Sequence, residues 1–333
     1  MPAPQVSILI PSYNHARYIK NCIESVQAQT LTDWELIIID DGSQDNSVDI
    51  AQAAATNDVR IRVFSNEVNL GTYGTEQKAL DMASGSFIAV MNSDDVWAPS
   101  KLERQVDALV QDPNAAFCYV MGATMNESGD VLADNVHADW PRSDPQEPLP
   151  YLLADNRILA SGVLFRRHTL RFETSCRYSG DWVALLEQSY LGHARCVDEP
   201  LVYWRQHESN SYRRSKAQTL EEIRVRKAIH QVGENWQVRG VSTNEIRRGL
   251  AANAMHLVPL LVLVNDITLA RSIGWHAVKN HQDRKGALKR FLSLNLGADR
   301  ARNHFWTIDD LAVVVVSEQE YASIPTLKIN LPD

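Results

Sequence analysis

Residues 34–43 read WELIIIDDGS, an apolar run that ends in two acidic residues, a glycine and a serine. The segment from Glu35 to Ile39 is too uniformly apolar for a strand that keeps one face in water. It therefore predicts a parallel strand that is covered on both faces. The polar stretch from Asp40 to Ser43 marks the end of this strand and the start of a loop.

The sequence around this strand repeats the order strand, loop, helix. Short β-branched runs predict the strands, and apolar residues at helical spacing predict the helices. In chain order these elements are Val6–Ile10, 18–28, 47–55, Ile61–Phe64, 75–83 and Phe87–Met91. We expect the first strand to stop at Pro11. Strands that alternate with helices in this way indicate an α/β fold with a doubly wound, mostly parallel sheet.

Polar residues follow each predicted strand. Ligands bind beyond the carboxyl ends of the strands in such sheets, so these residues should meet in one crevice. They are Pro11 to Asn14, the pair Asp40 and Asp41, the loop 69–74, and Asn92 to Asp95. Two acidic clusters in one crevice repel each other unless a cation or a polar ligand compensates. A metal ion with an anionic ligand is the simplest explanation.

The composition is that of a globular protein with an acidic balance. Among 333 residues, 44% are hydrophobic and 22% charged, which argues against global disorder. The 33 Lys and Arg against 41 Asp and Glu give a formal charge of −8, so a general nucleic-acid binder is not expected. A chain of this length predicts two domains, or one domain with a large appendage.

Targeting and redox signals point to the cytoplasm. The N-terminus lacks the basic region of a secretory signal, and apolar runs such as Leu257 to Val264 are too short to span a bilayer. The four cysteines are widely spaced and form no C-x-x-C motif, which favours a reducing compartment. We therefore predict a cytoplasmic protein whose membrane contact, if any, is peripheral at the inner face.

Residues 6–100 resemble the nucleotide-binding half of the large inverting glycosyltransferase family with the GT-A fold, the group that builds bacterial polysaccharides. The matching segments are VSILIPSYN (6–14), IESVQAQT (23–30), WELIIIDDGS (34–43) and ASG (83–85), which leads to NSDD (92–95). Less specific similarity continues to about residue 211. The resemblance implies a GT-A catalytic domain over 1–215, with a nucleotide-binding half (1–100) and an acceptor half (101–215).

The resemblance also implies how a nucleotide-sugar donor is held. Tyr13 is expected to stack on the base, and Asp41 to accept the imide N–H of a uracil. The full set of nucleotide-binding residues is Pro11, Ser12, Tyr13, Asp41, Asn69, Gly71, Asn92 and Ser93. The alternatives are a core aromatic residue for Tyr13 and a solvated turn for Asp40 to Gly42.

Residues 92–94 occupy the place of the family's D-x-D signature, which binds a divalent cation and the donor's ribose. The first acid is Asn92 here, so Asp94 is left as the carboxylate for Mn²⁺ or Mg²⁺, and a metal-poor mechanism stays open. His207 matches a family histidine that reaches the metal; the alternative is an unliganded histidine in a polar loop. Asp95 either supports Asp94 or caps a helix that begins near Pro99.

The second half should supply the catalytic base. A strand over Val163–Arg166 precedes a helix that opens at residues 178–182 and runs to about Leu191. By resemblance, Asp181 takes the proton from the acceptor hydroxyl; the alternative is a carboxylate that only stabilises the helix start. The family's Arg-Asn pair is replaced by Glu76 and Gln77, so the diphosphate lacks that arginine, and Lys78 is either its substitute or a surface charge.

The chain beyond residue 216 is expected to form a helical C-terminal region. Strands over 195–197 and 201–204 and a charged stretch at 212–216, either a linker or a lid over the diphosphate, lead into it. Predicted helices cover Leu220–Val232, Asn244–Leu263, Ile267–Val278 and Lys285–Leu294, and a strand-like run spans 313–316. This region is a candidate for binding the acceptor, a membrane face or a second copy of the chain.

The resemblance as a whole implies an inverting glycosyltransferase of hexosyl or N-acetylhexosaminyl type. Its donor would be a nucleoside diphosphate sugar, with UDP favoured, and its acceptor a hydroxyl of a glycan or lipid-linked glycan. The competing hypothesis is a non-catalytic scaffold that binds sugar nucleotides and works through its helical region. Asn92 and the missing arginine motivate this alternative.

Overall fold

The structure is a computed structural model that describes residues 3–136, 140, 142, 144, 146–208, 210, 215–236, 238, 240–294, 305 and 316–331. The chain forms two compact units. The first contains Met1–Gln146, Arg157–Ala184 and Gly192–Asn210, and the second contains Glu147–Asn156, Leu185–Leu191 and Ser211–Asp333. Two short segments that precede residue 192 therefore belong to the same unit as the helical C-terminal region.

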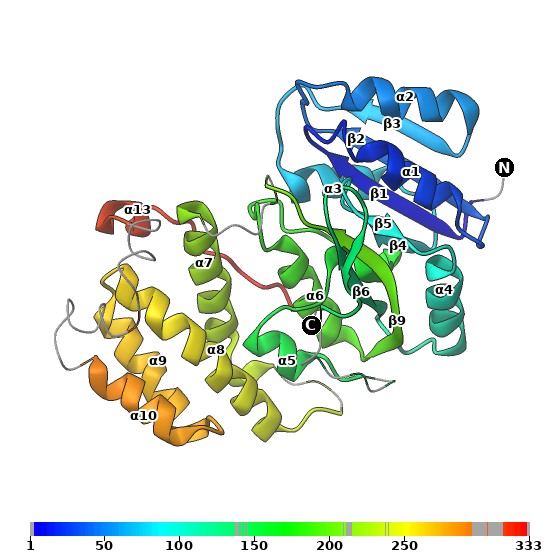
Figure 1. Cartoon of the computed structure of the whole chain (residues 1–333). Helices are drawn as coiled ribbons and strands as arrows, with labels where there is room; N and C mark the ends of the chain where they lie inside the picture. Colours follow the sequence, from blue (N-terminus) through cyan, green and yellow to red (C-terminus); the bar gives the residue numbers. More distant parts are fainter. Residues whose placement is uncertain are drawn as a thin grey trace. The chain divides into compact units, whose positions relative to one another are not determined.

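A nine-stranded mixed sheet forms the centre of the first unit (Figure 1). Its spatial order is β3 (Ile61–Ser65), β2 (Trp34–Asp40), β1 (Val6–Ser12), β4 (Phe87–Val90), β8 (Val163–Arg166), β6 (Phe117–Met125), β9 (Ala194–Arg205) and β5 (Val96–Trp97), with β7 (Val131–Ala133) paired to β6. The ladders among β1 to β4 are parallel, whereas β8 runs antiparallel to β4 and β6. The predicted α/β fold with a mostly parallel sheet is confirmed, and its parallel ladders lie among β1 to β4.

Burial explains why the quoted apolar run becomes a central strand. Every residue of β2 from Leu36 to Asp40 is buried, and β1 and β3 flank it. The prediction that Pro11 stops the first strand is wrong, because Pro11 pairs with Ile39 and β1 continues to Ser12. The ladder between β1 and β4 ends at Leu9, so the N–H that proline lacks faces no partner from β4 there.

Four helices connect these strands: α1 (Ile19–Gln27), α2 (Ser47–Asn57), α3 (Thr72–Asp81) and α4 (Lys101–Gln111). The apolar side chains of α1 that were spaced for a helix, such as Ile23 and Val26, are buried against the sheet. The helix predicted over 75–83 begins three residues earlier. Thr72 to Gly74 are therefore its first turn and not a loop, and Gly71 precedes it with a φ of +77°.

The remaining part of the first unit returns to the sheet. The two strands predicted over 195–197 and 201–204 are one strand, β9, whose pairing with β6 shifts register around Met121. Helix α6 (Gly180–Leu191) starts and ends close to its predicted bounds, and its residues after Ala184 belong to the second unit. Short 3-10 turns lie at Ala160–Gly162 and Arg167–Thr169.

The second unit is helical in its described residues. It contains α5 (Leu149–Ala154), α7 (Lys216–Val232), a 3-10 turn (Gly233–Asn235), α8 (Thr243–Leu263), α9 (Ile267–Asn280), α10 (Arg284–Ser293) and α13 (Glu318–Ala322). Ser215 and Ser242 form capping boxes with Gln218 and Glu245, which fixes where α7 and α8 begin. The apolar faces of α7 to α10 share one core, so the four predicted helices are confirmed.

Two predicted segments lie partly or wholly outside the described residues. These are the charged stretch 212–216, of which only Ser215 and Lys216 are described, and the strand-like run 313–316, of which only Val316 is described. Across the part of the chain that the structure describes, every helix is too short or too polar to cross a membrane.

Candidate active site

The first acidic pair, Asp40 and Asp41, is buried at the end of β2. The Asp40 carboxylate accepts hydrogen bonds from the N–H groups of Gly42 and Ser43 and closes its own turn. The Asp41 carboxylate accepts the N–H groups of Leu70 and Gly71, both at 2.8 Å. The pair is therefore an anchor for the loop that precedes α3, which excludes a solvated turn.

A side-chain network extends from Asp41 along α3. Nδ2 of Asn66 donates to the Asp41 carboxylate at 2.8 Å, and Nζ of Lys78 donates to Oδ1 of Asn66 at 2.7 Å. Asn69 donates to the Asp41 carbonyl at 2.9 Å. Lys78 is exposed but tethered, so it is not simply a solvated surface charge.

Arg177 lies over Gly71 and was missed by the sequence reasoning. A Cβ atom at Gly71 would lie 3.3 Å from Cγ of Arg177, so glycine leaves room for the arginine side chain. The Arg177 guanidinium donates to Oδ1 of Asn69. The structure thus places a guanidinium beside the loop before α3, in a chain that lacks arginine at positions 76 and 77.

Asp181 lies in the first turn of α6 and contacts the first turn of α3. The Tyr73 hydroxyl donates to Oδ1 of Asp181 at 2.9 Å. The backbone of Gly180 lies so near the Tyr73 ring that an added Cβ would come within 2.5 Å of Cγ. Burial raises the pKa of Glu76 well above its usual value, and the negative charge of Asp181 adds to this effect. Asp181 is therefore linked to the Asp41 network through α3.

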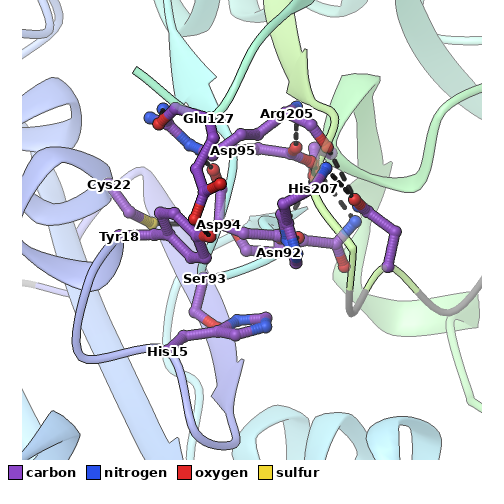
Figure 2. A network of polar contacts seen from close by, with 12 residues as sticks. His15, Tyr18, Cys22, Asn92, Ser93, Asp94, Asp95, Glu127, Arg205 and His207 are labelled. Atoms are coloured by element: carbon purple, nitrogen blue, oxygen red, sulfur yellow. Dashed lines mark hydrogen bonds and ion pairs between the residues drawn. The ribbon is translucent and has the colours of Figure 1, made fainter. Parts of the chain in front are cut away.

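The second acidic pair, Asp94 and Asp95, follows β4 and faces two histidines (Figure 2). Nε2 of His207 lies 2.9 Å from Oδ2 of Asp94, within hydrogen-bonding distance. One ligand atom from each of His15, Asp94 and His207 lies within 4.8 Å of the other two. We call these three residues the histidine cluster. They come from the loop after β1, the loop after β4 and the segment after β9.

Charge balance differs between the two members of this pair. Burial works against ionisation of Asp94, but the hydrogen bond from His207 and the charge of His15 outweigh it, so the pKa of Asp94 lies below its usual value. Burial, and then the charge of Asp94, raise the pKa of Asp95 to about 8. Asp94 is therefore the member that carries negative charge at neutral pH.

Asp95 braces the segments that carry the histidine cluster. Its carboxylate accepts the Ser161 hydroxyl, the Arg205 N–H at 3.2 Å and Nδ2 of Asn92 at 3.3 Å. Nε of Arg205 donates to the Asp94 carbonyl at 2.8 Å. Helix α4 begins at Lys101 after Ser100, so Asp95 does not cap it; of the two predicted roles, support of Asp94 is the one these contacts favour.

An aromatic ring packs against His207, and a carboxylate in turn binds the hydroxyl of that ring. The Tyr18 ring stacks on His207 with centroids 4.7 Å apart, and the Tyr18 hydroxyl donates to Glu127 at 2.8 Å. Figure 2 shows Tyr18, Glu127 and Arg205 around the cluster. Tyr18 and Glu127 lie far from His207 in the sequence, and no motif pointed to either of them.

The other predicted nucleotide-binding residues lie at the carboxyl ends of β1 and β4. Tyr13 is 49% exposed, which excludes a core aromatic residue. Ser12 is buried, and its hydroxyl has no hydrogen-bond partner within the described part of the chain. Pro11 is half-buried, and the Ser93 hydroxyl lies 2.7 Å from Nδ1 of His15. Asn92 directs its amide to Asp95, and its role toward a ribose stays a prediction.

Comparison with known proteins identifies the sheet-bearing part of the chain. The model of glycosyl transferase family 2 matches residues 7–170. The putative teichuronic acid biosynthesis glycosyltransferase TuaG of Bacillus subtilis is 38% identical over 135 residues, which are 40% of this chain and 53% of TuaG. WfgD of Escherichia coli, a UDP-Glc:alpha-D-GlcNAc-diphosphoundecaprenol beta-1,3-glucosyltransferase, is 41% identical over 114 residues, 34% of this chain and 44% of WfgD. The chain thus spans about half the length of these curated relatives.

A solved structure extends the likeness of the fold to nearly the whole chain. S. aureus TarS 1-349 in complex with UDP-GlcNAc superposes with a TM-score of 0.59 over 96% of this chain and 91% of that one. The sequence identity is 15%, so this likeness shows the fold alone. Together with the family match, it confirms the predicted GT-A fold with a helical C-terminal region.

Proposed function

Because the chain belongs to glycosyl transferase family 2 through its residues 7–170, we propose that it transfers a sugar from a nucleoside diphosphate donor to an acceptor hydroxyl. The observation that carries the proposal is the histidine cluster, in which a buried ionised Asp94 meets two imidazoles at the carboxyl ends of β1 and β4. Two members of the cluster, Asp94 and His207, suit a divalent cation, and a cation there would offset the charge of a diphosphate.

The donor we propose is a UDP-sugar carrying a hexose or an N-acetylhexosamine. The name of WfgD specifies UDP-Glc, and TarS was solved with UDP-GlcNAc. The exposed ring of Tyr13 is available for stacking on a base, and the buried Ser12 hydroxyl offers a donor and an acceptor. Asp41 already accepts three protein donors, which leaves one acceptor position of its carboxylate for a uracil N–H.

The proposed chemistry is a single inverting displacement. The acceptor oxygen forms a bond to the anomeric carbon while the bond from that carbon to the diphosphate oxygen breaks. Asp181 takes the proton of the acceptor hydroxyl, and Tyr73 holds the Asp181 carboxylate in place. Asp94 and His207 would hold Mn²⁺ or Mg²⁺, which supplies positive charge to the departing diphosphate.

The acceptor we propose is a hydroxyl of a glycan or lipid-linked glycan in polysaccharide biosynthesis. The names of TuaG and WfgD point to this class, and the assignment comes to this chain by similarity. Residues 216–333 are a candidate acceptor surface because this whole region lies beyond the family match, which ends at residue 170.

The test is release of nucleoside diphosphate from a panel of nucleotide sugars with Mn²⁺ present, measured by chromatography with and without glycan acceptors. Asp181→Asn should lower kcat by about 10²–10⁴-fold, since general-base assistance is lost. The matched control is Asp49→Asn, which alters an exposed carboxylate in the first turn of α2 and should leave kcat unchanged. Donor binding without turnover for every sugar would instead support the scaffold hypothesis.

A further inference from the structure

We infer that His15 is a third protein ligand of the divalent cation, and that the site therefore prefers Mn²⁺ and similar transition metals to Mg²⁺. This deepens the proposed function, on which it rests for the role of the cation. His15 lies outside the D-x-D signature and outside the metal residues predicted from the sequence, which were Asp94 and His207. The inference comes from the three-dimensional cluster alone.

Distance is the first argument. Asp94 and His207 are already in contact at 2.9 Å, and the ligand atom of His15 lies within 4.8 Å of both. Two ligands about 2.1 Å from one cation can be at most about 4.2 Å apart. The three ligand atoms are therefore close to coordination distance, and small side-chain rotations would bring them onto one cation.

Orientation is the second argument, because His15 is held from several directions. Its N–H donates to the Ser47 hydroxyl at 3.0 Å. The neighbouring N–H groups of Asn14 and Ala16 donate to Ser43 at 2.8 Å and to Asp45 at 2.9 Å. The Ser93 hydroxyl contacts the His15 ring at 2.7 Å, as groups around a metal site orient histidine ligands. The backbone that carries the imidazole is thus fixed before any cation binds, and the Ser93 hydroxyl orients the ring.

Charge and ligand type supply the third argument. Asn92 removes one carboxylate from the signature, and its amide is engaged by Asp95. Two imidazoles and one carboxylate remain, and imidazole nitrogen suits divalent transition metals, of which Mn²⁺ is the weakest binder, whereas Mg²⁺ is held by oxygen ligands. His15 thus compensates for Asn92 by ligand number and shifts the preference of the site toward transition metals.

The experiment measures cation binding directly on the full chain after removal of metals with a chelator. Calorimetry gives the affinities for Mn²⁺ and Mg²⁺, and Co²⁺ absorption reports nitrogen ligands through its visible bands. We expect Mn²⁺ to bind at least tenfold more tightly than Mg²⁺. His15→Ala should weaken Mn²⁺ binding at least tenfold and change the Co²⁺ spectrum. The matched control is His168→Ala, which removes an exposed histidine of the same unit and should change neither.

The outcomes separate this inference from the proposed function. If Mn²⁺ binding depends on His207 but not on His15, the inference is wrong and the transferase proposal stands. If His15→Ala loses Mn²⁺ while the parent transfers no sugar, the inference stands and the transferase proposal fails. Equal affinity of the parent for Mg²⁺ and Mn²⁺ overturns the metal preference, a test that needs no variant to fold.

Discussion

The two acidic pairs of the first unit lie near the carboxyl ends of β2 and β4 but have different roles. Asp40 and Asp41 are surrounded by N–H donors of the backbone, so their carboxylates hold loops in place. Asp94 faces two imidazoles, and Asp95 braces the strands around it. The same dipeptide is therefore an anchor in one loop and a candidate ligand set in the next, depending on which groups approach it.

The pairs also differ in how their charge is compensated. The first is balanced by N–H dipoles, including those at the start of α3, whose N-terminus carries partial positive charge. In the second, Asp94 is balanced by the histidines, and the raised pKa of Asp95 keeps it mostly protonated at neutral pH. The sequence argument that both pairs need a cation therefore applies to the second pair only.

The largest effect should come from breaking the ligand set. Asp94→Ala removes the only carboxylate of the histidine cluster, so we expect the transfer rate to fall about 10³-fold, or ~4 kcal/mol in activation free energy. Its free energy of unfolding in chelator should fall by only about 1 kcal/mol, because one hydrogen bond is lost. A variant that keeps parental kcat would remove Asp94 from the reaction.

Substitution of Asp41, the anchor of the loop before α3, should have its main effect on stability. Asp41→Ala leaves three donors without their acceptor, so the free energy of unfolding should fall by about 3 kcal/mol. Urea denaturation of Asp41→Ala and Asp94→Ala side by side checks this. If Asp94→Ala is less stable than Asp41→Ala in the absence of metal, the assignment of Asp41 as the structural anchor is wrong.

A smaller effect is expected at the contact between Tyr73 of α3 and Asp181, the candidate base. Tyr73→Phe deletes the hydrogen bond to Asp181 but keeps the ring against Gly180. We expect kcat to fall about tenfold, near 1.4 kcal/mol, with KM for the donor unchanged, since only the orientation of the base is lost. Steady-state kinetics separate the two constants. A rise in KM with constant kcat would assign Tyr73 to donor binding instead.

The smallest effect that we expect is a pH dependence of stability that arises from Glu76. Because burial raises the pKa of Glu76, the folded chain keeps a proton that the unfolded chain releases above about pH 4.5. Stability of the parent should therefore fall as pH rises from 5 to 8 relative to Glu76→Gln, which has no such proton. Urea unfolding at several pH values measures this. Glu24→Gln, an exposed change on α1, should track the parent; parallel curves for Glu76→Gln would contradict the expectation.

Local sequence patterns were sufficient to predict much of the fold. Apolar spacing located α1 and the helices α7 to α10, and the uniform run of β2 indicated a strand buried on both faces. Boundaries set by tertiary contacts were not predictable in this way. The start of α3 depends on Asp41 accepting N–H groups from a loop some thirty residues away, and the length of β1 depends on where β4 ends.

The site was only partly predictable for the same reason. Asp94 and His207 were singled out by resemblance, and the structure brings them into contact; Asp181 is placed beside Tyr73, and its role as base stays a prediction. His15 and Arg177 carried no signal because their neighbours, Asp94 and Gly71, are distant along the chain. Only the fold brings such residues together.

Helix α6 has a practical consequence for how this chain can be dissected. It starts with the candidate base, yet its residues from Leu185 onward belong to the second unit, where Oε1 of Glu187 accepts the N–H of Asn330. A fragment that ends at residue 215 would keep this part of the helix, including the buried Leu185 and Leu186, but lose most of the unit to which it belongs. Enzymology on this protein is best done with the polypeptide intact.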